Sequence, residues 1–284
     1  MRGDASWLEN VIAEFIASSP ENSLRNEENE RAWDQPLVGF SRGDDPLYAF
    51  FKEDIGPFYW TPEEIMSLTF PGVALAPGRL TVISWVLPHT AATRSDNAAQ
   101  KNLPAERWSR ARNFGEDCNH ALARHVVSLL AARGIMAVAP TLSPLWAWQE
   151  AEKYGFASNW SERHAAHVSG LGTFGLCDGL ITRRGKAMRC GSVVAALAVE
   201  PTPRPYTSCR QYCLFYSGGK CRKCAARCPV GAVTDDGHDK EKCRRYLFET
   251  AAPHAEARYG FASYGCGLCQ TGVPCEAGIP APGD

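Results

Sequence analysis

Apolar residues recur at helical spacing near the start of the chain and again near its middle. Residues three or four positions apart lie on one face of a helix, so such spacing predicts an amphipathic helix. Gly134 closes the second stretch, as glycine often does at a helix end. Helices are therefore predicted over 5–18 and 117–133, with apolar faces formed by Leu8, Ile12, Phe15 and Ile16 and by Leu122, Val126, Leu129 and Leu130.

Shorter apolar runs alternate with these helices. Residues 80–88 are rich in β-branched and aromatic side chains and predict a buried strand, and 135–140 and 179–184 predict two more. A short helical pattern occupies 161–169, and an apolar run follows at 191–199. This order predicts a mixed α/β (α+β) domain in which helices pack on a sheet.

Composition and charge narrow the class of protein. The 284 residues are 45% hydrophobic and 21% charged, which suits folded domains with real cores and excludes a disordered or fibrous chain. The 30 basic and 31 acidic residues nearly cancel, so the charge suggests neither a nucleic-acid groove nor a membrane surface. No apolar run resembles an export signal or a membrane span. We therefore expect a cytoplasmic protein that does not act at a membrane.

Cysteine is concentrated at the end of the chain. Of the 12 cysteines, only Cys118, Cys177 and Cys190 precede residue 200. The composition changes directly after the proline-dense residues 201–205, which predicts a domain boundary there, with an α/β domain over 1–205 and a cysteine-rich domain over 206–284. Clustered thiols in a reducing compartment are more often metal ligands than disulfides.

The spacing of these cysteines predicts iron–sulfur clusters. The segment CRKCAARCP has the form C-x2-C-x3-C-P, the second half of a bacterial ferredoxin run, in which the cysteine before proline binds the other cluster. A second group follows in CGLCQTGVPC. The crossing rule predicts two [4Fe–4S] clusters. Their ligand sets are Cys213, Cys221, Cys224 and Cys275 for one cluster, and Cys228, Cys243, Cys266 and Cys269 for the other.

Alternatives remain open for the cysteines. Zinc sites made of four cysteines also use C-x2-C pairs, although their two pairs are usually well separated. Cys209 competes with Cys213 as the first ligand, and proximity to Cys221 favours Cys213. The three early cysteines are interpreted as small buried hydrophobic residues.

A glycine-rich segment, GLGTFG, spans 170–175 and matches the dinucleotide-binding pattern in spacing alone. A helical pattern precedes it and a strand pattern follows, the reverse of the order that this fold requires. Two interpretations remain: a tight turn whose glycines adopt positive φ, or a loop that lets the backbone approach a large cofactor.

Taken in order, the helix ending in GLGTFG, the following GSVV, the split double-cluster region and the isolated cysteine in KCRRYLFE resemble the epoxyqueuosine reductase family, which is related to reductive dehalogenases. The resemblance covers roughly 110–280. It implies a nitroreductase-like or flavodoxin-like domain that binds cobalamin, with a bacterial ferredoxin-like domain carrying two [4Fe–4S] clusters that reduce the cobalt.

The resemblance also implies which residues contact the corrinoid. By position these are Gly170, Gly172 and Gly175 of the glycine segment, and Gly191 and Ser192 of the following GS, with Trp160 beside the preceding helix. The eight cysteines named above match the family's cluster ligands.

The chain departs from the family pattern at the proton donor. Counting back from Gly170 places Phe156 where the family has an aspartate. Glu162 is the nearest acid, and His164 and His167 are further candidates as proton donor or cobalt ligand, although solvated carboxylates and helix-surface histidines are the ordinary interpretation. The catalytic residue is therefore left unassigned, and action on transfer RNA is not expected.

Two functions follow from these observations. The first is a cobalamin-dependent, iron–sulfur oxidoreductase that performs reductive chemistry on a small substrate, supplied with electrons by a ferredoxin or flavodoxin. The alternative is an electron-transfer protein that reduces a partner protein or acts as a redox carrier, without a substrate of its own.

Overall fold

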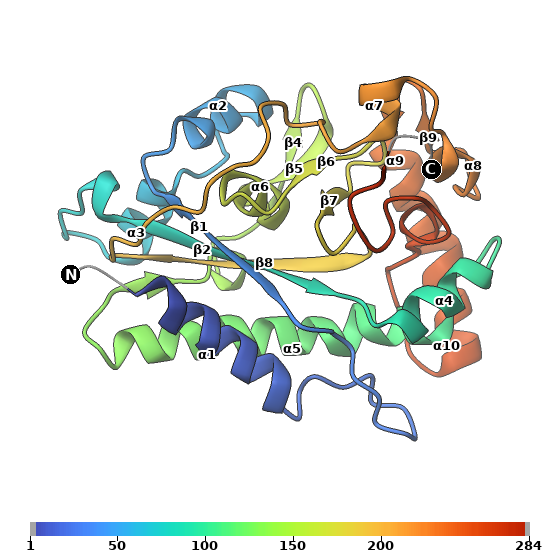
Figure 1. Cartoon of the computed structure of the whole chain (residues 1–284), viewed down its shortest axis with the longest axis horizontal. Coiled ribbons are helices and arrows are strands. Elements are labelled where there is room, and N and C mark those ends of the chain that lie inside the picture. Colours follow the sequence, from blue (N-terminus) through green and yellow to red (C-terminus); the bar gives the residue numbers. More distant parts are fainter. Residues whose placement is uncertain (1–3, 282–284) are drawn as a thin grey trace.

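The computed structural model describes residues 4–281. A four-stranded sheet lies at its centre, with the strand order β1-β2-β8-β3 (Figure 1). Each neighbouring pair is antiparallel, and β2 is buried along its whole length because helices cover both faces of the sheet. The strands are β1 Leu37–Arg42, β2 Thr81–Pro88, β8 Met188–Ala195 and β3 Ala137–Val138.

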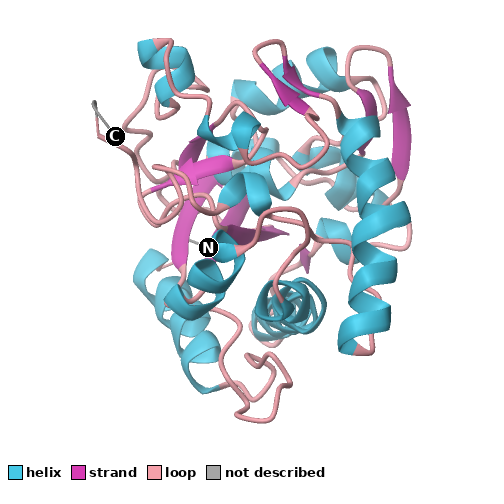
Figure 2. Cartoon of the chain, turned by 90° about the vertical axis from the view of Figure 1, so that its right-hand side faces the viewer, coloured by secondary structure: helices cyan, strands magenta, loops and turns pink. Residues whose placement is uncertain are grey.

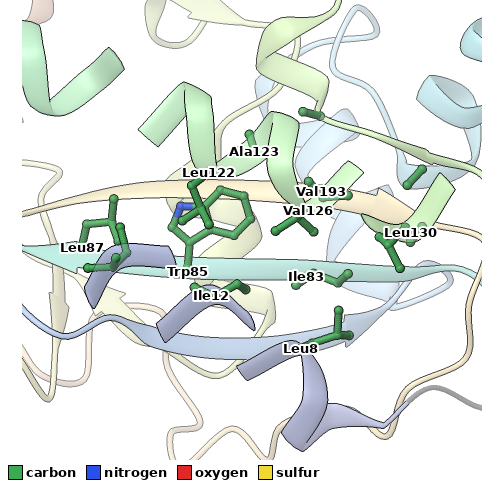
Figure 3. Packing of buried hydrophobic residues seen from close by; sticks show 14 of the residues in the cluster. Leu8, Ile12, Ile83, Trp85, Leu87, Leu122, Ala123, Val126, Leu130 and Val193 are labelled. Carbon is green, nitrogen blue, oxygen red and sulfur yellow. The ribbon is translucent and has the colours of Figure 1, made fainter. Parts of the chain in front are cut away.

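Two helices cover one face of this sheet, α1 (Ala5–Ser18) and α5 (Glu106–Ala131). Their apolar faces meet β2 and β8 in the largest hydrophobic core (Figure 3). Burial of each large apolar side chain in such a core contributes about 1.5–3 kcal/mol. The residues labelled in this core are Leu8, Ile12, Ile83, Trp85, Leu87, Leu122, Ala123, Val126, Leu130 and Val193.

A second core lies on the opposite face and is rich in aromatic residues. It is built by α2 (Pro46–Ile55), α3 (Pro62–Thr69) and α6 (Glu162–Val168) against β2, β3 and β8. Both α2 and α3 begin with proline after a capping side chain, Asp45 and Thr61, which accounts for their sharp starts. Figure 1 shows α2 and α6 on the side of the sheet away from α1 and α5.

The cysteine-rich segment packs at one end of the sheet (Figure 1). Figure 2 views the molecule from that side, where short helices are joined by long loops. Its elements are α7 Leu214–Gly218, α8 Lys223–Ala226, β9 Val233–Thr234, β10 Gly237–His238, α9 Lys240–Tyr246 and α10 Ala252–Tyr259, with a π-helical turn over Leu247–Ala251 and a 3-10 turn over Leu268–Gln270.

The remaining elements connect these layers. The hairpins β4–β5 and β6–β7 lie between β3 and β8 in the chain, and α4 precedes α5. Their bounds are β4 Trp148–Ala151, β5 Gly155–Ser158, β6 Gly172–Phe174, β7 Leu180–Thr182 and α4 Ala91–Ala99, with 3-10 turns at Pro77–Arg79 and Pro140–Leu142. No helix within 4–281 is long and apolar enough to cross a membrane.

The predicted helices and strands are largely confirmed, with two corrections. The antiparallel sheet means that the flavodoxin-like alternative, which requires parallel strands, was wrong. The helix predicted over 117–133 begins eleven residues earlier, at Glu106. The first part of the helix was not predicted, because it contains Gly115 and glycine is a poor helix former. Glycine is required at this position, since a Cβ there would approach the ring of Trp33 to 2.6 Å.

Candidate metal centre

One group of cysteines surrounds a small cavity formed largely by the cysteine-rich segment. Its lining includes Cys213, which caps α7, and Cys224 within α8. Cys221 and Cys275 complete the thiols, and Leu176, between β6 and β7, and Lys186, between β7 and β8, also line the cavity. The structure thus brings together the four cysteines predicted as the first ligand set.

The second group of cysteines borders a larger cavity. Cys228 follows α8 and Cys243 lies in α9, whereas Cys266 precedes the 3-10 turn and Cys269 lies within it. The backbone N–H of Ala232 donates to the sulfur of Cys228 at 3.1 Å. These four cysteines are the second predicted ligand set, and they share one cavity.

The other cysteines differ in position. Cys209 is exposed and is not among the residues that line either cavity, whereas Cys213 is buried at the smaller one. Cys118 and Cys190 are buried in the hydrophobic cores, where burial raises the pKa of each thiol to about 12. Both therefore behave as the small hydrophobic residues predicted from the sequence.

Cys177 does not fit that interpretation. It lies on the tight turn 175–179, where the amide of Gly175 donates to the carbonyl of Gly179, and it borders the larger cavity. Hydrogen bonds with the thiols of Cys224 and Cys269, together with the nearby Lys186 ammonium, lower the pKa of Cys177 well below its usual range despite burial. Its sulfur therefore lies between one member of each cysteine group.

Lys186 is the charged partner of this sulfur. Its ammonium donates to the sulfur of Cys177 at 3.3 Å, and the residue is only 2% exposed. Burial alone would lower the pKa of Lys186, but the sulfurs of Cys177, Cys275 and Cys224 outweigh it and raise the pKa. A buried ammonium requires anionic neighbours, and here the neighbours are cysteines.

This donor chemistry fits two [4Fe–4S] clusters. Each cubane takes four cysteine thiolates, one on each iron, so its ligands surround a volume rather than a point. All 12 cysteines lie within the described residues and none is in a disulfide bond. In the described part of the chain, no three His, Cys, Asp or Glu side chains are arranged to hold a single metal ion.

Aromatic side chains also line the larger cavity. His89 lies between the rings of Trp33 and Trp108, with ring centroids 4.6 Å and 4.1 Å away. Burial, with Arg189 and Arg94 nearby, lowers the pKa of His89 to about 3, so the imidazole is neutral. Among the described residues its Nδ1 has no hydrogen-bond partner.

Positive charge also faces this cavity. Arg112, Arg163 and Arg189 all line it, and Glu116 lies within ion-pair distance of Arg112 and Arg189. Two guanidinium groups therefore share one carboxylate. The positive charge of Arg189, followed by burial, lowers the pKa of Arg112 to about 10. Such an arrangement favours a negatively charged occupant.

His238 also belongs to the larger cavity. Its Nδ1 lies 3.3 Å from Oδ2 of Asp178, and the residue borders the same space as Cys243. Burial would lower the pKa of His238, but hydrogen bonds with Asp178 and Cys243 raise it to about 10. The imidazole is therefore charged near neutral pH and adds to the positive wall.

Glu162, the first of the catalytic candidates, lies in a half-buried polar network beside β8. The hydroxyls of Thr141 and Ser192 donate to its two carboxylate oxygens, and the indole of Trp160 donates to the hydroxyl of Ser192 at 3.1 Å. Burial raises the pKa of Glu162 to about 7, although these hydrogen bonds oppose the rise. Glu162 does not line either cavity.

The two histidine candidates pack against aromatic rings. His164 lies edge-on to Phe51, and burial lowers its pKa to about 3. His167 is buried, stacks on Tyr206 and donates from Nδ1 to the carbonyl of Gly172 at 2.7 Å. Neither lines the two cavities described above.

The residues predicted to contact a corrinoid are packed against the protein itself. A Cβ on Gly191 would approach the indole of Trp85 to 2.5 Å, and one on Gly172 would approach the carbonyl of Ile181 to 2.3 Å. Gly170 has a φ of 79° and supports the tight-turn interpretation.

Gly175, Ser192 and Trp160 likewise border neither cavity, and Trp160 and Ser192 are buried. The six residues predicted from the resemblance therefore lie outside the lining of both cavities.

Sequence reasoning missed several residues of these cavities. Cys177 and Lys186 meet because the chain turns at 175–179 and again at 182–185, a closure that no periodicity reveals. His89, Trp33 and Trp108 come from separate parts of the chain. His238 was missed as well, and the available signal for it is its place five residues before Cys243.

No family model and no curated protein sequence matches the chain. Solved structures do share its fold. A selenomethionine-labelled epoxyqueuosine reductase aligns with a TM-score of 0.50 and 17% identity, covering 98% of this chain and 68% of that chain. An epoxyqueuosine reductase from Bacillus subtilis gives the same TM-score, identity and coverage.

A catabolic reductive dehalogenase, solved in complex with 3-bromo-4-hydroxybenzoic acid, aligns with a TM-score of 0.52 and 15% identity. The alignment covers 96% of this chain but only 37% of the dehalogenase chain. The chain therefore shares its fold with epoxyqueuosine reductase and with reductive dehalogenases, and the resemblance predicted from the motifs is confirmed for the fold.

Proposed function

We propose that this chain is an iron–sulfur redox protein that binds two [4Fe–4S] clusters and delivers electrons to an acceptor in the larger cavity. The observation that carries the proposal is the division of eight cysteines between two cavities, four around each. The buried Lys186 supports it, since an ammonium among cysteines is stable only where the sulfurs carry negative charge.

When bound, the clusters would supply one-electron transfer. The protein's own residues would do the rest. Cys213, Cys221, Cys224 and Cys275 would hold one cluster, and Cys228, Cys243, Cys266 and Cys269 would hold the other. The contact between Cys177 and both groups makes the two cluster sites neighbours, with the buried side chains of Cys177 and Lys186 beside them. Exclusion of water from this gap limits the reorganisation that accompanies each electron transfer.

The acceptor side is formed by the front part of the chain, which we separate from the cluster-binding part near residue 205. Trp33, His89 and Trp108 supply an apolar wall, and the arginines Arg112, Arg163 and Arg189 supply positive charge. A small, negatively charged acceptor or an anionic group on a partner suits this wall. His89 is neutral and offers an unpaired ring nitrogen for orienting such a group.

This proposal favours an electron-transfer role over the cobalamin-dependent enzyme. The six residues expected to contact a corrinoid border neither cavity. The family's aspartate has no counterpart at Phe156, whose ring packs against Trp148. A corrinoid-dependent oxidoreductase would need a different set of contacts from the one that the resemblance implies.

The test is an anaerobic titration of cluster-loaded protein with cob(II)alamin, followed by electron paramagnetic resonance of the cobalt. We expect the cluster signals of the reduced protein and a cobalt signal identical to that of the free cofactor. A stoichiometric change in the cobalt signal would overturn the carrier role and restore the corrinoid enzyme. Absence of reducible clusters would overturn both.

A further inference from the structure

A single buried cation occupies the gap between the two cysteine groups. Lys186 lines the smaller cavity, whereas its partner Cys177 borders the larger one. The contact between their side chains, 3.3 Å from nitrogen to sulfur, therefore joins the two cavities. The position is fixed by the backbone, because the amide of Lys186 donates to the carbonyl of Cys275 at 2.9 Å.

The turn before Lys186 fixes the position of its backbone. Gly185 has a φ of 81°, and a Cβ there would lie 2.0 Å from the carbonyl oxygen of Glu276. Only glycine allows the two backbones to approach so closely. The turn therefore presses Lys186 against the segment that carries Cys275.

No carboxylate within residues 4–281 forms an ion pair with Lys186. An ammonium without an anionic neighbour is strongly unfavourable at 2% exposure, so its charge must be balanced by the sulfurs around it. The ammonium contacts the sulfur of Cys177, and Lys186 lines the smaller cavity together with its four cysteines but does not line the larger one. The charge therefore lies nearer to the smaller cavity.

We propose that the buried charge of Lys186 raises the reduction potential of the cluster in the smaller cavity relative to that of the cluster in the larger one. Lys186 would thereby determine which cluster holds the first electron. The inference rests on the proposed function, since it requires both clusters. Reduction adds one negative charge to a cluster, and a fixed positive charge in a region of low dielectric stabilises the reduced form. The first electron to enter the protein therefore resides beside Lys186 until an acceptor is present.

The experiment is a redox titration of the cluster-loaded full chain, with each cluster followed by electron paramagnetic resonance. The test variant is Lys186→Met, which removes the charge and keeps the length of the side chain. We expect the equilibrium ratio of electrons on the two clusters to shift at least tenfold toward the larger cavity, a change of about 59 mV in the difference of their potentials.

Lys223→Met is the matched control. Lys223 also lines the smaller cavity, but it is exposed, so water and salt screen its charge. Its removal should change the same ratio by less than about threefold. Lys186→Arg, which retains the charge, should preserve the wild-type distribution. An equal effect of the two methionine variants would overturn the inference.

Iron content separates this inference from the proposed function. If the wild-type protein does not hold two reducible clusters, the proposed function is wrong. If the wild type and Lys186→Met both hold two clusters and the difference between their potentials is the same in both proteins, only the inference is wrong. Should Lys186→Met fail to fold, Lys186→Gln provides a shorter neutral side chain. Failure of both neutral variants to hold the clusters would assign Lys186 a structural role and overturn the inference.

Discussion

The indole of Trp85 lies directly across the backbone of Gly191, its partner in the register between β2 and β8. A single added methyl group at Gly191 would approach the ring to 2.5 Å. Trp85 is fully buried and donates from its indole to the side chain of Asn119 at 2.8 Å, so the ring is not free to move. Gly191 is thus required by packing within the sheet.

Gly191→Ala should therefore destabilise the protein by about 1–3 kcal/mol, the usual cost of overpacking a core. Gly218→Ala is the control, because a Cβ there meets no atom within 4 Å. Its effect should be neutral or slightly stabilising. Denaturant unfolding of both variants measures the difference. Equal stability of the two variants would contradict the packing role of Gly191.

The contribution of Glu162 to the stability of the folded protein should fall as the pH rises. Its carboxyl has a pKa of about 7 in the folded protein, raised chiefly by burial from an ordinary value of 4.5. The folded state therefore binds more protons than the unfolded state between about pH 4.5 and 7, and stability is lost as pH rises through that window. Glu162→Gln should flatten this slope and raise stability at pH 8 by about 1–3 kcal/mol.

Urea unfolding at several pH values measures this slope. The exposed Glu9→Gln, in α1, serves as the control and should leave the slope as it is in the wild type. A slope that survives unchanged in Glu162→Gln would show that another group is responsible.

Glu116 should stabilise the cationic wall of the larger cavity. Its carboxylate is the shared partner of Arg112 and Arg189, and the charge of Arg189 holds the pKa of Glu116 low against the effect of burial. Glu116→Gln leaves two guanidinium groups facing each other. Because both are partly exposed, we expect a loss of about 1–2 kcal/mol, reduced by added salt.

Asp44→Asn is the comparison for Glu116. Asp44 pairs with Arg42 at the surface, where both side chains are more than a third exposed. That pair should contribute less than about 1 kcal/mol. Thermal unfolding at low and high salt distinguishes the two sites, and equal losses would argue against a special role for Glu116.

The charge of the larger cavity should select among electron acceptors. Reduced, cluster-loaded protein should pass electrons to the anion ferricyanide faster than Arg163→Met does, by roughly three- to tenfold at low salt. With the cation hexaammineruthenium(III) the order should reverse or disappear. Stopped-flow oxidation measures both rates. Arg79→Met changes an exposed arginine outside the cavity lining and should leave both rates near the wild-type values.

Much of the fold could be predicted from the sequence because its main elements have one clear periodicity. The helix α1 and the strand β2 appear where apolar spacing predicts them. The start of α5 could not be predicted, because its first eleven residues are mainly polar and include Gly115, which Trp33 covers in the folded protein. In such regions, contacts between segments that are distant in the sequence determine whether the chain is helical.

The cysteine groups illustrate the same limit at the site. Spacing alone separated Cys224 from Cys228, which lie four residues apart in the chain but border different cavities. Spacing did not identify Cys177, whose place between the groups depends on two turns and on Lys186. The aromatic and cationic residues of the larger cavity come from helices, strands and loops far apart in sequence, so only the folded chain brings them together.

We propose that two clusters occupy two separate cysteine sets. Counting iron and sulfide tests this division, combined with electron paramagnetic resonance of anaerobically loaded wild type and of Cys224→Ala, Cys269→Ala and Cys209→Ala. We predict about eight irons for wild type and for Cys209→Ala, the number that two [4Fe–4S] clusters require. Cys224→Ala and Cys269→Ala should each lose one cluster and retain the spectrum of the other. Stoichiometric zinc in place of iron, or loss of the same signal in both variants, would contradict the account.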